Sequence, residues 1–426
     1  MQAETVRASS PLWSVLAYAG VSLSTLSWVP LLASGGTILE LSNMTQLMLI
    51  LLLPAILLFS RPAPMIHLVF VLLVAWSLVM MLALTLHGQS GGTGFIRQQF
   101  PQALFGWSLA LCIANSRVKV SRVALVGLVA LFAALELSAI SAGASAIIGA
   151  LDFVTTLDRT TFIFRVLRPA LNVFINQEGD PVYVASQINN VANTIVLLAC
   201  LVFFSGAEQP SGSRRILGNT VAGLALIFAF IMFSSSAVLT MALFALAMMF
   251  QVTLRLPSHL RNLAILFILT LVIVLYQPVN TFLEVNLSED EVSRSVRVEQ
   301  FKFAMSAINS NVFTGVGYFE VGGHVIHNWM LFSWATGGLA AFLIVLAVYG
   351  TLILMALMLV RTTPKGAPTV IALLTMFLIR TSVGGAGGIP SGPAILAAAL
   401  LTGLLVRNYR PQARRVQAPT AIQGLS

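Results

Sequence analysis

Residues 66–87 read IHLVFVLLVAWSLVMMLALTLH, an apolar run without a single Asp, Glu, Lys or Arg side chain. A transmembrane helix needs about 20 mainly apolar residues in a row, so this run predicts a membrane-spanning helix. Similar runs recur along the 426-residue chain, in which 58% of the residues are hydrophobic and 9% are charged. Soluble domains contain about 45–50% apolar and about 25% charged residues. The composition therefore excludes a soluble enzyme, a disordered tail and a coiled coil.

The spacing of the apolar runs predicts an all-α polytopic membrane protein, with residues 1–426 forming a single integral membrane domain. We expect about twelve transmembrane helices. The expected spans are 11–33, 44–60, 66–87, 100–115, 122–142, 186–206, 216–233, 235–254, 260–277, 328–358, 367–381 and 390–407. The fourth and eleventh are short, whereas the tenth is long enough to begin as a helix above the membrane.

The positions of Lys and Arg predict the orientation, because cytoplasmic segments of membrane proteins carry an excess of both. With the N-terminus placed in the cytoplasm, every expected cytoplasmic segment contains at least one of them, and the outer turn 35–43 contains none. Both termini are then cytoplasmic, and residues 408–426 form a basic cytoplasmic tail. The net charge of +9 thus reflects membrane orientation, and no nucleic-acid partner is expected.

Two of the expected outer segments, 143–185 and 278–327, are long, and the others are short turns. Long loops in compact proteins are usually functional or disordered. Both segments contain aromatic residues and amphipathic stretches, so we expect them to form amphipathic helices that fold onto the outer face. Acidic residues are concentrated in the same two segments, so basic side chains retained there call for an explanation.

The second long loop contains residues 294–309, RSVRVEQFKFAMSAIN, which form an amphipathic pattern at helical spacing. Arg297 shares a stripe with Phe301 and further apolar side chains, and Arg294 lies beside that stripe. Lys302 falls on the opposite, solvated face. A guanidinium that faces protein or headgroups is costly unless paired, and its planar donors suit carboxylates and phosphates. A structural ion pair or a snorkelling arginine explains the same placement.

Glycine and histidine follow this helix. Gly315 and Gly317 allow a tight backbone, and His324 and His327 come just before the next span. An imidazole can take a proton from a sugar hydroxyl near neutral pH; the alternative is a polar tip at a helix start. Glu320 and the two histidines have a spacing that could hold zinc on a helix, but two glycines interrupt it. No zinc motif is present, so neither a metal nor another cofactor is expected.

The stretch from Arg297 to Gly338 resembles the signature region of the bacterial O-antigen ligase and polysaccharide polymerase superfamily. That pattern has an arginine with an aromatic residue one turn later, a Gly-x-Gly, a His-Asn pair opening a span, and closing glycines. The matching residues are Arg297, Phe301, Gly315-Val316-Gly317, His327-Asn328 and Gly337-Gly338. The chain departs from the pattern at Phe301 and Val312, where the family usually has Trp and Pro. It also departs at Ser234-Ser235-Ser236, where a Ser-Arg pair is frequent.

The first long loop resembles a second feature of this family, an arginine ahead of an acidic-Pro segment that leads into a span. In the sequence RVLRPALNVFINQEGDPVYVA, Arg168 fits best and Arg165 is the alternative. A solvated or interfacial cation explains either residue equally well. Arg97 and Arg380 stand at outer span ends, where they can snorkel or join the site.

The resemblance implies a metal-independent glycosyltransferase of the bacterial inner membrane that acts on its periplasmic face. The donor is then an oligosaccharide on undecaprenyl diphosphate, and the acceptor is a sugar hydroxyl on a second lipid-linked glycan (polymerase) or on lipid A-core (ligase). Membrane lipid and other polysaccharide assembly proteins are further expected partners. The implied catalytic residues are His327 as base and Arg297, the implied diphosphate ligands are Arg168, Arg294 and Arg297, and the implied supporting residues are Asn328, His324, Gly315 and Gly317.

Two alternatives stay open. The departures from the ligase-like pattern favour a polymerase slightly over a ligase. A lipid-linked glycan flippase or a secondary transporter is the rival from another class, since twelve spans suit it equally well. Carriers often place ionisable groups and broken helices at the bilayer midplane in two related halves. Here the polar residues gather in two unequal outer loops, which favours the enzyme.

Overall fold

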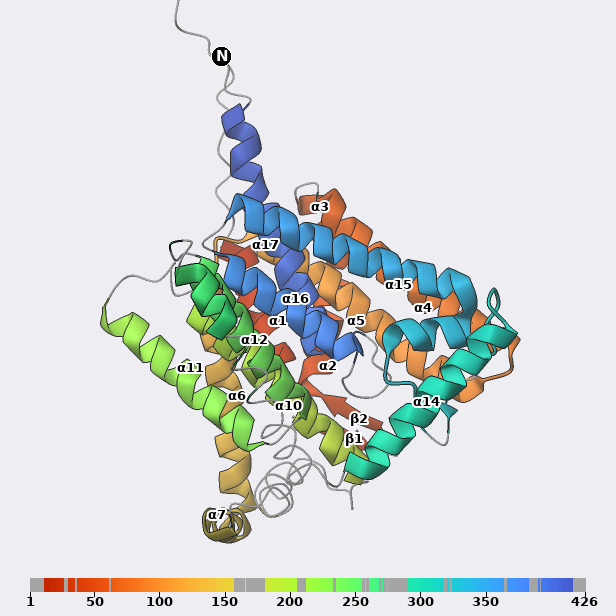
Figure 1. Cartoon of the computed structure of the whole chain (residues 1–426), viewed down its shortest axis with the longest axis horizontal. Helices are drawn as coiled ribbons and strands as arrows, with labels where there is room; N and C mark the ends of the chain where they lie inside the picture. The colour runs from red at the N-terminus through yellow and green to blue at the C-terminus, as the bar shows by residue number, and fades with distance from the viewer. Residues whose placement is uncertain are drawn as a thin grey trace, which may run out of the picture.

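Apolar runs separated by short polar, glycine or proline breaks fold into a bundle of helices (Figure 1). The structure is a computed structural model of the whole chain. It describes residues 11–26, 30–34, 37–60, 63–156, 165, 181–204, 212–232, 235–254, 257, 260–267, 270, 274, 290–317, 320–321, 324–363, 366–382, 390 and 392–416.

In the N-terminal part, helices follow one another with one short hairpin between the first two. The elements are α1 Pro11–Ser24, β1 Pro30–Ser34, β2 Thr37–Glu40, α2 Leu41–Leu51, α3 Leu53–Phe59, α4 Pro64–Leu86, α5 Ser90–Asn115, α6 Val120–Ala142 and α7 Ala144–Thr156. Proline occupies the first turn of both α3 and α4, where its missing N–H costs nothing. Gly143, with φ of +66°, ends α6 and lets the chain turn directly into α7.

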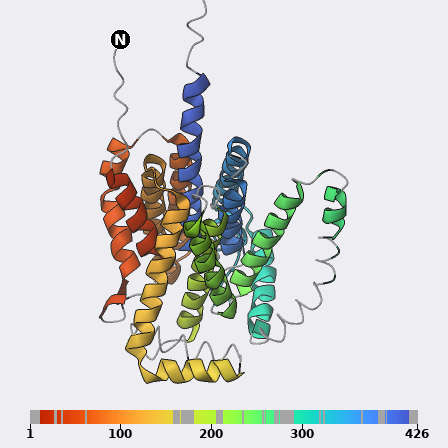
Figure 2. The same ribbon diagram turned by 90° about the vertical axis from the view of Figure 1, so that its left-hand side faces the viewer.

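The C-terminal part contains the remaining helices and a second, very short hairpin. These elements are α10 Pro181–Phe204, α11 Ser213–Ile231, α12 Ser235–Leu254, α14 Asp290–Ser310, β3 Glu320–Val321, β4 His324–Val325, α15 Trp329–Thr362, α16 Ala367–Ser382 and α17 Pro393–Val416. Most helices of the bundle run along a common direction, and α7 lies across one end of it (Figure 2).

Two helices are buried on nearly all sides and form the centre of the bundle. In α10, every side chain from Val191 to Val202 is buried, and in α17 the same holds from Ala394 to Leu405. Apolar helices without a polar face are expected only inside a large core or a membrane protein. Close approach of α17 to α5 depends on glycine, because a Cβ at Gly403 would lie 2.8 Å from the Ala110 carbonyl oxygen.

Three helices of the described part are long and apolar enough to cross a membrane: Pro64–Leu86, Val120–Leu137 and Trp329–Thr362. Shorter apolar helices lie at Pro11–Ser24, Asn189–Phe204, Arg215–Ile231, Ser236–Leu246, Ala367–Ser382 and Pro393–Asn408. Large apolar side chains such as Leu58, Phe59 and Leu86 point outward, as lipid-facing side chains do. The prediction of a helical protein with membrane-spanning helices is confirmed at this level.

Three expected spans differ from the structure. The first ends early, because Pro30–Ser34 pairs as an antiparallel strand with Thr37–Glu40. The second is divided into α2 and α3 at Leu52, two residues before a proline that cannot donate a backbone hydrogen bond. The tenth is not one straight helix, because Gly338 has non-helical backbone angles inside α15. Of the expected ninth span, 260–277, the structure describes residues 260–267, 270 and 274, and all of them are helical.

Candidate functional site

Helix α14 carries the predicted signature arginine and presents its buried face through Gln300, Ala304, Ala307 and Ile308. The sequence-based stripe was wrong in one respect: Phe301 is 52% exposed, and Gln300, at 2%, takes the inward position beside it. At 3.6 residues per turn, the backbone position of Arg297 on α14 is about one turn before Gln300. The side chains of Arg294 and Arg297 lie outside the described part. Lys302 is exposed, as the sequence predicted.

Gln300 contacts the predicted base. Nδ1 of His327 lies 2.9 Å from Oε1 of Gln300, across 27 residues of sequence. The amide oxygen can only accept a hydrogen bond, so in this contact Nδ1 of His327 is the donor, and Nε2 is the other ring nitrogen. The contact fixes the imidazole against α14, one turn from Arg297. Gln300 was not predicted from the sequence, although its helical spacing to Ala304, Ala307 and Ile308 indicates the same face of the helix.

Asn328 has a structural role that the resemblance did not specify. It is the N-cap of α15, and its side-chain oxygen accepts a hydrogen bond from the backbone N–H of Leu331 at 3.0 Å. This bond satisfies one of the free N–H groups of the first turn. Because His327 directly precedes Asn328 in the sequence, the cap also fixes the position of the His327 backbone relative to the start of α15.

The loop after α14 docks onto the kink in α15. Backbone N–H groups of Val316 and Gly317 donate to the carbonyls of Ala335 and Thr336, at 2.8 and 3.2 Å, and Leu339 N–H donates to Phe313 O at 3.2 Å. These bonds use backbone groups that a continuous helix would pair internally.

Glycine is required on both sides of this contact. Gly315, Gly317 and Gly338 all have φ near +70°, a region that L side chains rarely adopt. A Cβ at Gly315 would lie 2.5 Å from Thr336 O, and one at Gly338 would lie 2.1 Å from Phe313 O. The Gly-x-Gly and the closing glycine of the signature therefore act as one interlocked unit.

The kink folds the start of α15 back along its own continuation. Trp329 lies before Gly338 and Tyr349 lies well after it, yet their ring centroids are only 5.6 Å apart. Trp329 also packs edge-on against Trp76 of α4 and Phe377 of α16, at 5.4 and 6.3 Å. The segment bearing His327 is thus anchored by a buried aromatic cluster of α4, α15 and α16.

An arginine of α16 is buried near this cluster. Arg380 is 5% exposed, and its Nη2 donates to Oδ1 of Asn190 in α10 at 2.6 Å. It follows Phe377 by one turn and precedes Thr381, which accepts a hydrogen bond from the Tyr349 hydroxyl at 2.6 Å. Of the two readings offered by the sequence, snorkelling to the surface is wrong, because the guanidinium is enclosed by helices.

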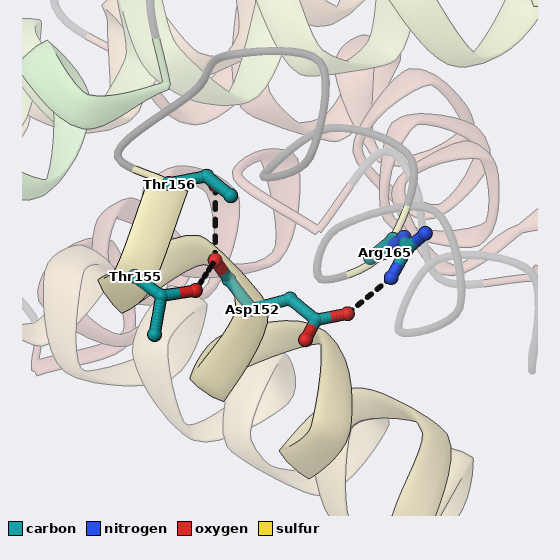
Figure 3. Close-up of polar contacts among 4 residues, drawn as sticks. All are labelled: Asp152, Thr155, Thr156 and Arg165. Atoms are coloured by element: carbon teal, nitrogen blue, oxygen red, sulfur yellow. Dashed lines mark hydrogen bonds and ion pairs between the residues drawn. The ribbon is translucent and has the colours of Figure 1, made fainter.

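Of the two candidate arginines in the first long loop, Arg165 lies within the described residues. Arg165 forms an ion pair with Asp152 of α7, and the two side chains remain largely in contact with solvent (Figure 3). The carbonyl oxygen of Asp152 accepts hydrogen bonds from the hydroxyls of Thr155 and Thr156 (Figure 3). Arg165 is therefore a solvated, paired cation. Arg168 lies outside the described residues, and its predicted role stays a prediction.

The metal alternative assumed a helix through residues 320–327. Instead, β3 and β4 form a hairpin in which Glu320 pairs with Val325 and Val321 with His324. The helical spacing of Glu320, His324 and His327 therefore does not apply. The side chains of Glu320 and His324 lie outside the described part. Within that part, His, Cys, Asp and Glu side chains form no group of three that could hold a metal.

No protein-family model and no curated protein sequence matches the chain. The site must therefore be interpreted from its own residues. It consists of the imidazole of His327, the position of Arg297 on α14 one turn from the Gln300 that contacts this imidazole, and a glycine-containing turn that joins the two segments.

Proposed function

We propose that this protein is a membrane glycosyltransferase of surface polysaccharide biosynthesis, of the O-antigen or exopolysaccharide polymerase type. It transfers a glycan from undecaprenyl diphosphate to a sugar hydroxyl on the periplasmic face of the bacterial inner membrane. The proposal includes about twelve spans, two long periplasmic loops and cytoplasmic termini. Transfer to lipid A-core, as by a ligase, is the second possible outcome of the same chemistry.

The observation that carries the proposal is the 2.9 Å contact between His327 and Gln300. It supports an imidazole whose Nε2 can accept the proton of the acceptor hydroxyl. The hydroxyl oxygen then bonds to the anomeric carbon, the bond from that carbon to the diphosphate oxygen breaks, and undecaprenyl diphosphate leaves. The proton passes from His327 to solvent.

The leaving diphosphate gains negative charge as the anomeric bond breaks, and fixed positive charge lowers the barrier for that step. Arg297 is the arginine in best position, because its place on α14 is one turn from the residue that holds His327. Arg168 and Arg294 are the further proposed diphosphate ligands. Asn328 and the glycines hold the turn, while His324 is proposed to lie nearby.

The first prediction uses two basic residues on one helix. Arg297→Ala should lower transfer about 10²–10³-fold, by analogy with loss of one charge-stabilising donor, and abolish polymerised polysaccharide in a strain that depends on the variant. Lys302→Ala removes an equal charge from the exposed face of α14 and should leave polysaccharide unchanged. Immunoblots of membranes check that both variants are present in equal amount.

Electrophoresis of lipopolysaccharide and of secreted glycan distinguishes the outcomes. Products with a single repeat indicate a lost polymerase, whereas full-length chains that remain on the lipid carrier indicate a lost ligase. Unchanged polysaccharide in the Arg297→Ala strain, or equal loss in both strains, would contradict the role given to Arg297.

A further inference from the structure

Arg380 has unused hydrogen-bonding capacity in a place where it is costly. Its Nε and Nη1 atoms are buried and have no hydrogen-bond partner among the described residues, while Nη2 is held by Asn190. Ionisable side chains within apolar helices are rare and usually mark a functional site. Arg380 is such a case, because it has no ion-pair partner among the described residues, and burying a charge without one is strongly unfavourable.

A second buried donor is found at the start of α15, which packs against α16. The indole Nε1 of Trp329 is also buried without a partner among the described residues, although the rest of the ring packs against Trp76, Tyr349 and Phe377. Phe377 links the two donors, because it contacts Trp329 directly and precedes Arg380 by one turn of α16. Among the described residues, Nε and Nη1 of Arg380 and Nε1 of Trp329 have no acceptor, so the partner we look for is an acceptor, and the positive charge of Arg380 calls for an anion.

The position of Arg380 in α16 indicates which kind of anion can reach it. Arg380 lies in the last turn of α16, at the end of the bundle where the first arm of α15 and His327 also lie. The anionic group available at the end of a membrane-embedded helix is the phosphate of a lipid, either a phospholipid headgroup or a polyprenyl diphosphate. We propose that Arg380, positioned by Asn190 and assisted by Trp329, binds a lipid phosphate group.

This site is additional to the three arginines of the proposed diphosphate cluster, and only the identity of the lipid rests on the proposed function. If the protein transfers glycans, the bound group is the diphosphate of the donor. If it does not, a phosphate site at Arg380 still stands, because it follows from the burial and the unpaired donors alone.

The test measures thermal unfolding of the full-length protein in uncharged detergent by circular dichroism. Undecaprenyl diphosphate, phosphatidylglycerol and inorganic pyrophosphate are added separately. A ligand that binds only the folded protein raises the midpoint, here by at least about 2 °C at saturation. Arg380→Met should abolish the increase, and Arg380→Lys should retain part of it. Arg117→Met, which removes an exposed cation, should leave it intact.

The midpoint without ligand gives an independent readout. If the free donors of Arg380 are satisfied only by a bound ligand, the Arg380→Met substitution removes unsatisfied buried donors from the ligand-free protein. The unfolding midpoint of this variant should then equal or exceed that of the wild type. A pronounced drop would instead indicate that a carboxylate of the chain already pairs with Arg380, and would overturn the proposal. So would a wild type that no phosphate ligand stabilises, or an increase of equal size in Arg380→Met.

The three ligands identify the source of the phosphate. Stabilisation by undecaprenyl diphosphate alone assigns the site to the donor, and stabilisation by phosphatidylglycerol assigns it to bulk lipid. A His327→Ala protein that still shows the increase, but no longer transfers glycan, separates this binding site from the proposed reaction. If neither the wild type nor any variant transfers glycan, that result would contradict the proposed function and would leave the proposed phosphate site unaffected.

Discussion

At the scale of single residues, the orientation of the proposed base depends on the side-chain amide of Gln300. Gln300 is buried in α14 and its Oε1 atom contacts Nδ1 of His327, so this contact orients the ring and favours a proton on Nδ1. In this account Gln300 is a positioning residue that acts through His327 and does not itself touch the reacting atoms.

A pair of substitutions at position 300 separates orientation from charge. Gln300→Leu removes the acceptor and should lower the transfer rate about tenfold or more, since a correctly oriented base contributes about 10²–10⁴-fold. Gln300→Glu keeps the acceptor and adds a negative charge that favours the protonated imidazole.

The pH–rate profile is the decisive readout for Gln300→Glu. A protonated base cannot act, so the acidic limb of the profile should move to higher pH by about one unit or more. A merely structural role for Gln300 predicts a lower rate with an unshifted profile. Ser306→Glu, on the exposed face of the same helix, adds the same charge and should leave the profile in place.

At the scale of elements, the glycine interlock holds the imidazole-bearing segment against α14. The loop 313–317 and the kink at Gly338 share backbone hydrogen bonds, so we expect each to stabilise the conformation of the other. Two glycines of α15 offer a matched comparison. A Cβ at Gly338 would collide with Phe313 O, whereas one at Gly350 would meet nothing within 4 Å.

Gly338→Ala should therefore destabilise the purified protein by about 1–3 kcal/mol or more, from backbone strain and from the displaced loop. Gly350→Ala should be neutral or stabilising by up to about 1 kcal/mol, because alanine is the better helix former. Thermal unfolding in detergent measures both. Equal midpoints for the two variants would show that the loop does not depend on the kink.

The sequence predicted the positions of most helices because an apolar run is a local property. It also predicted that Gly315 and Gly317 form a tight turn and that Lys302 is exposed. It did not predict that the first part of α15 folds back so that Trp329 packs against Tyr349. A long apolar run does not show whether a glycine pair within it continues the helix or kinks it. The bonds that hold the kink come from residues distant in sequence.

The inward position of Gln300 was missed for a different reason. An aromatic residue at position 301 is readily assigned to the apolar stripe, yet single large apolar side chains are often exposed on a protein surface. The burial of Arg380 also depends on tertiary packing, because an arginine at the end of a span has the same sequence context whether it snorkels or is enclosed.

At the scale of the whole molecule, the bundle brings α14, the first arm of α15 and α16 together at one end. The other end contains the termini of the helices that carry most exposed cations, such as Arg117 and Arg361. The proposed orientation assigns the first end to the periplasm. That arrangement places the proposed base, the signature arginine and the buried Arg380 on the side where lipid-linked glycans are assembled.

The most direct test of the central claim is the rate of glycan transfer by the purified protein, reconstituted in vesicles with undecaprenyl-diphosphate-linked repeats. The wild type and Lys302→Ala should form longer glycans and release undecaprenyl diphosphate at the same rate. His327→Ala and Arg297→Ala should each be slower by about 10²-fold or more. A wild type that forms no glycosidic bond, or an Arg297→Ala protein as fast as Lys302→Ala, would contradict the account.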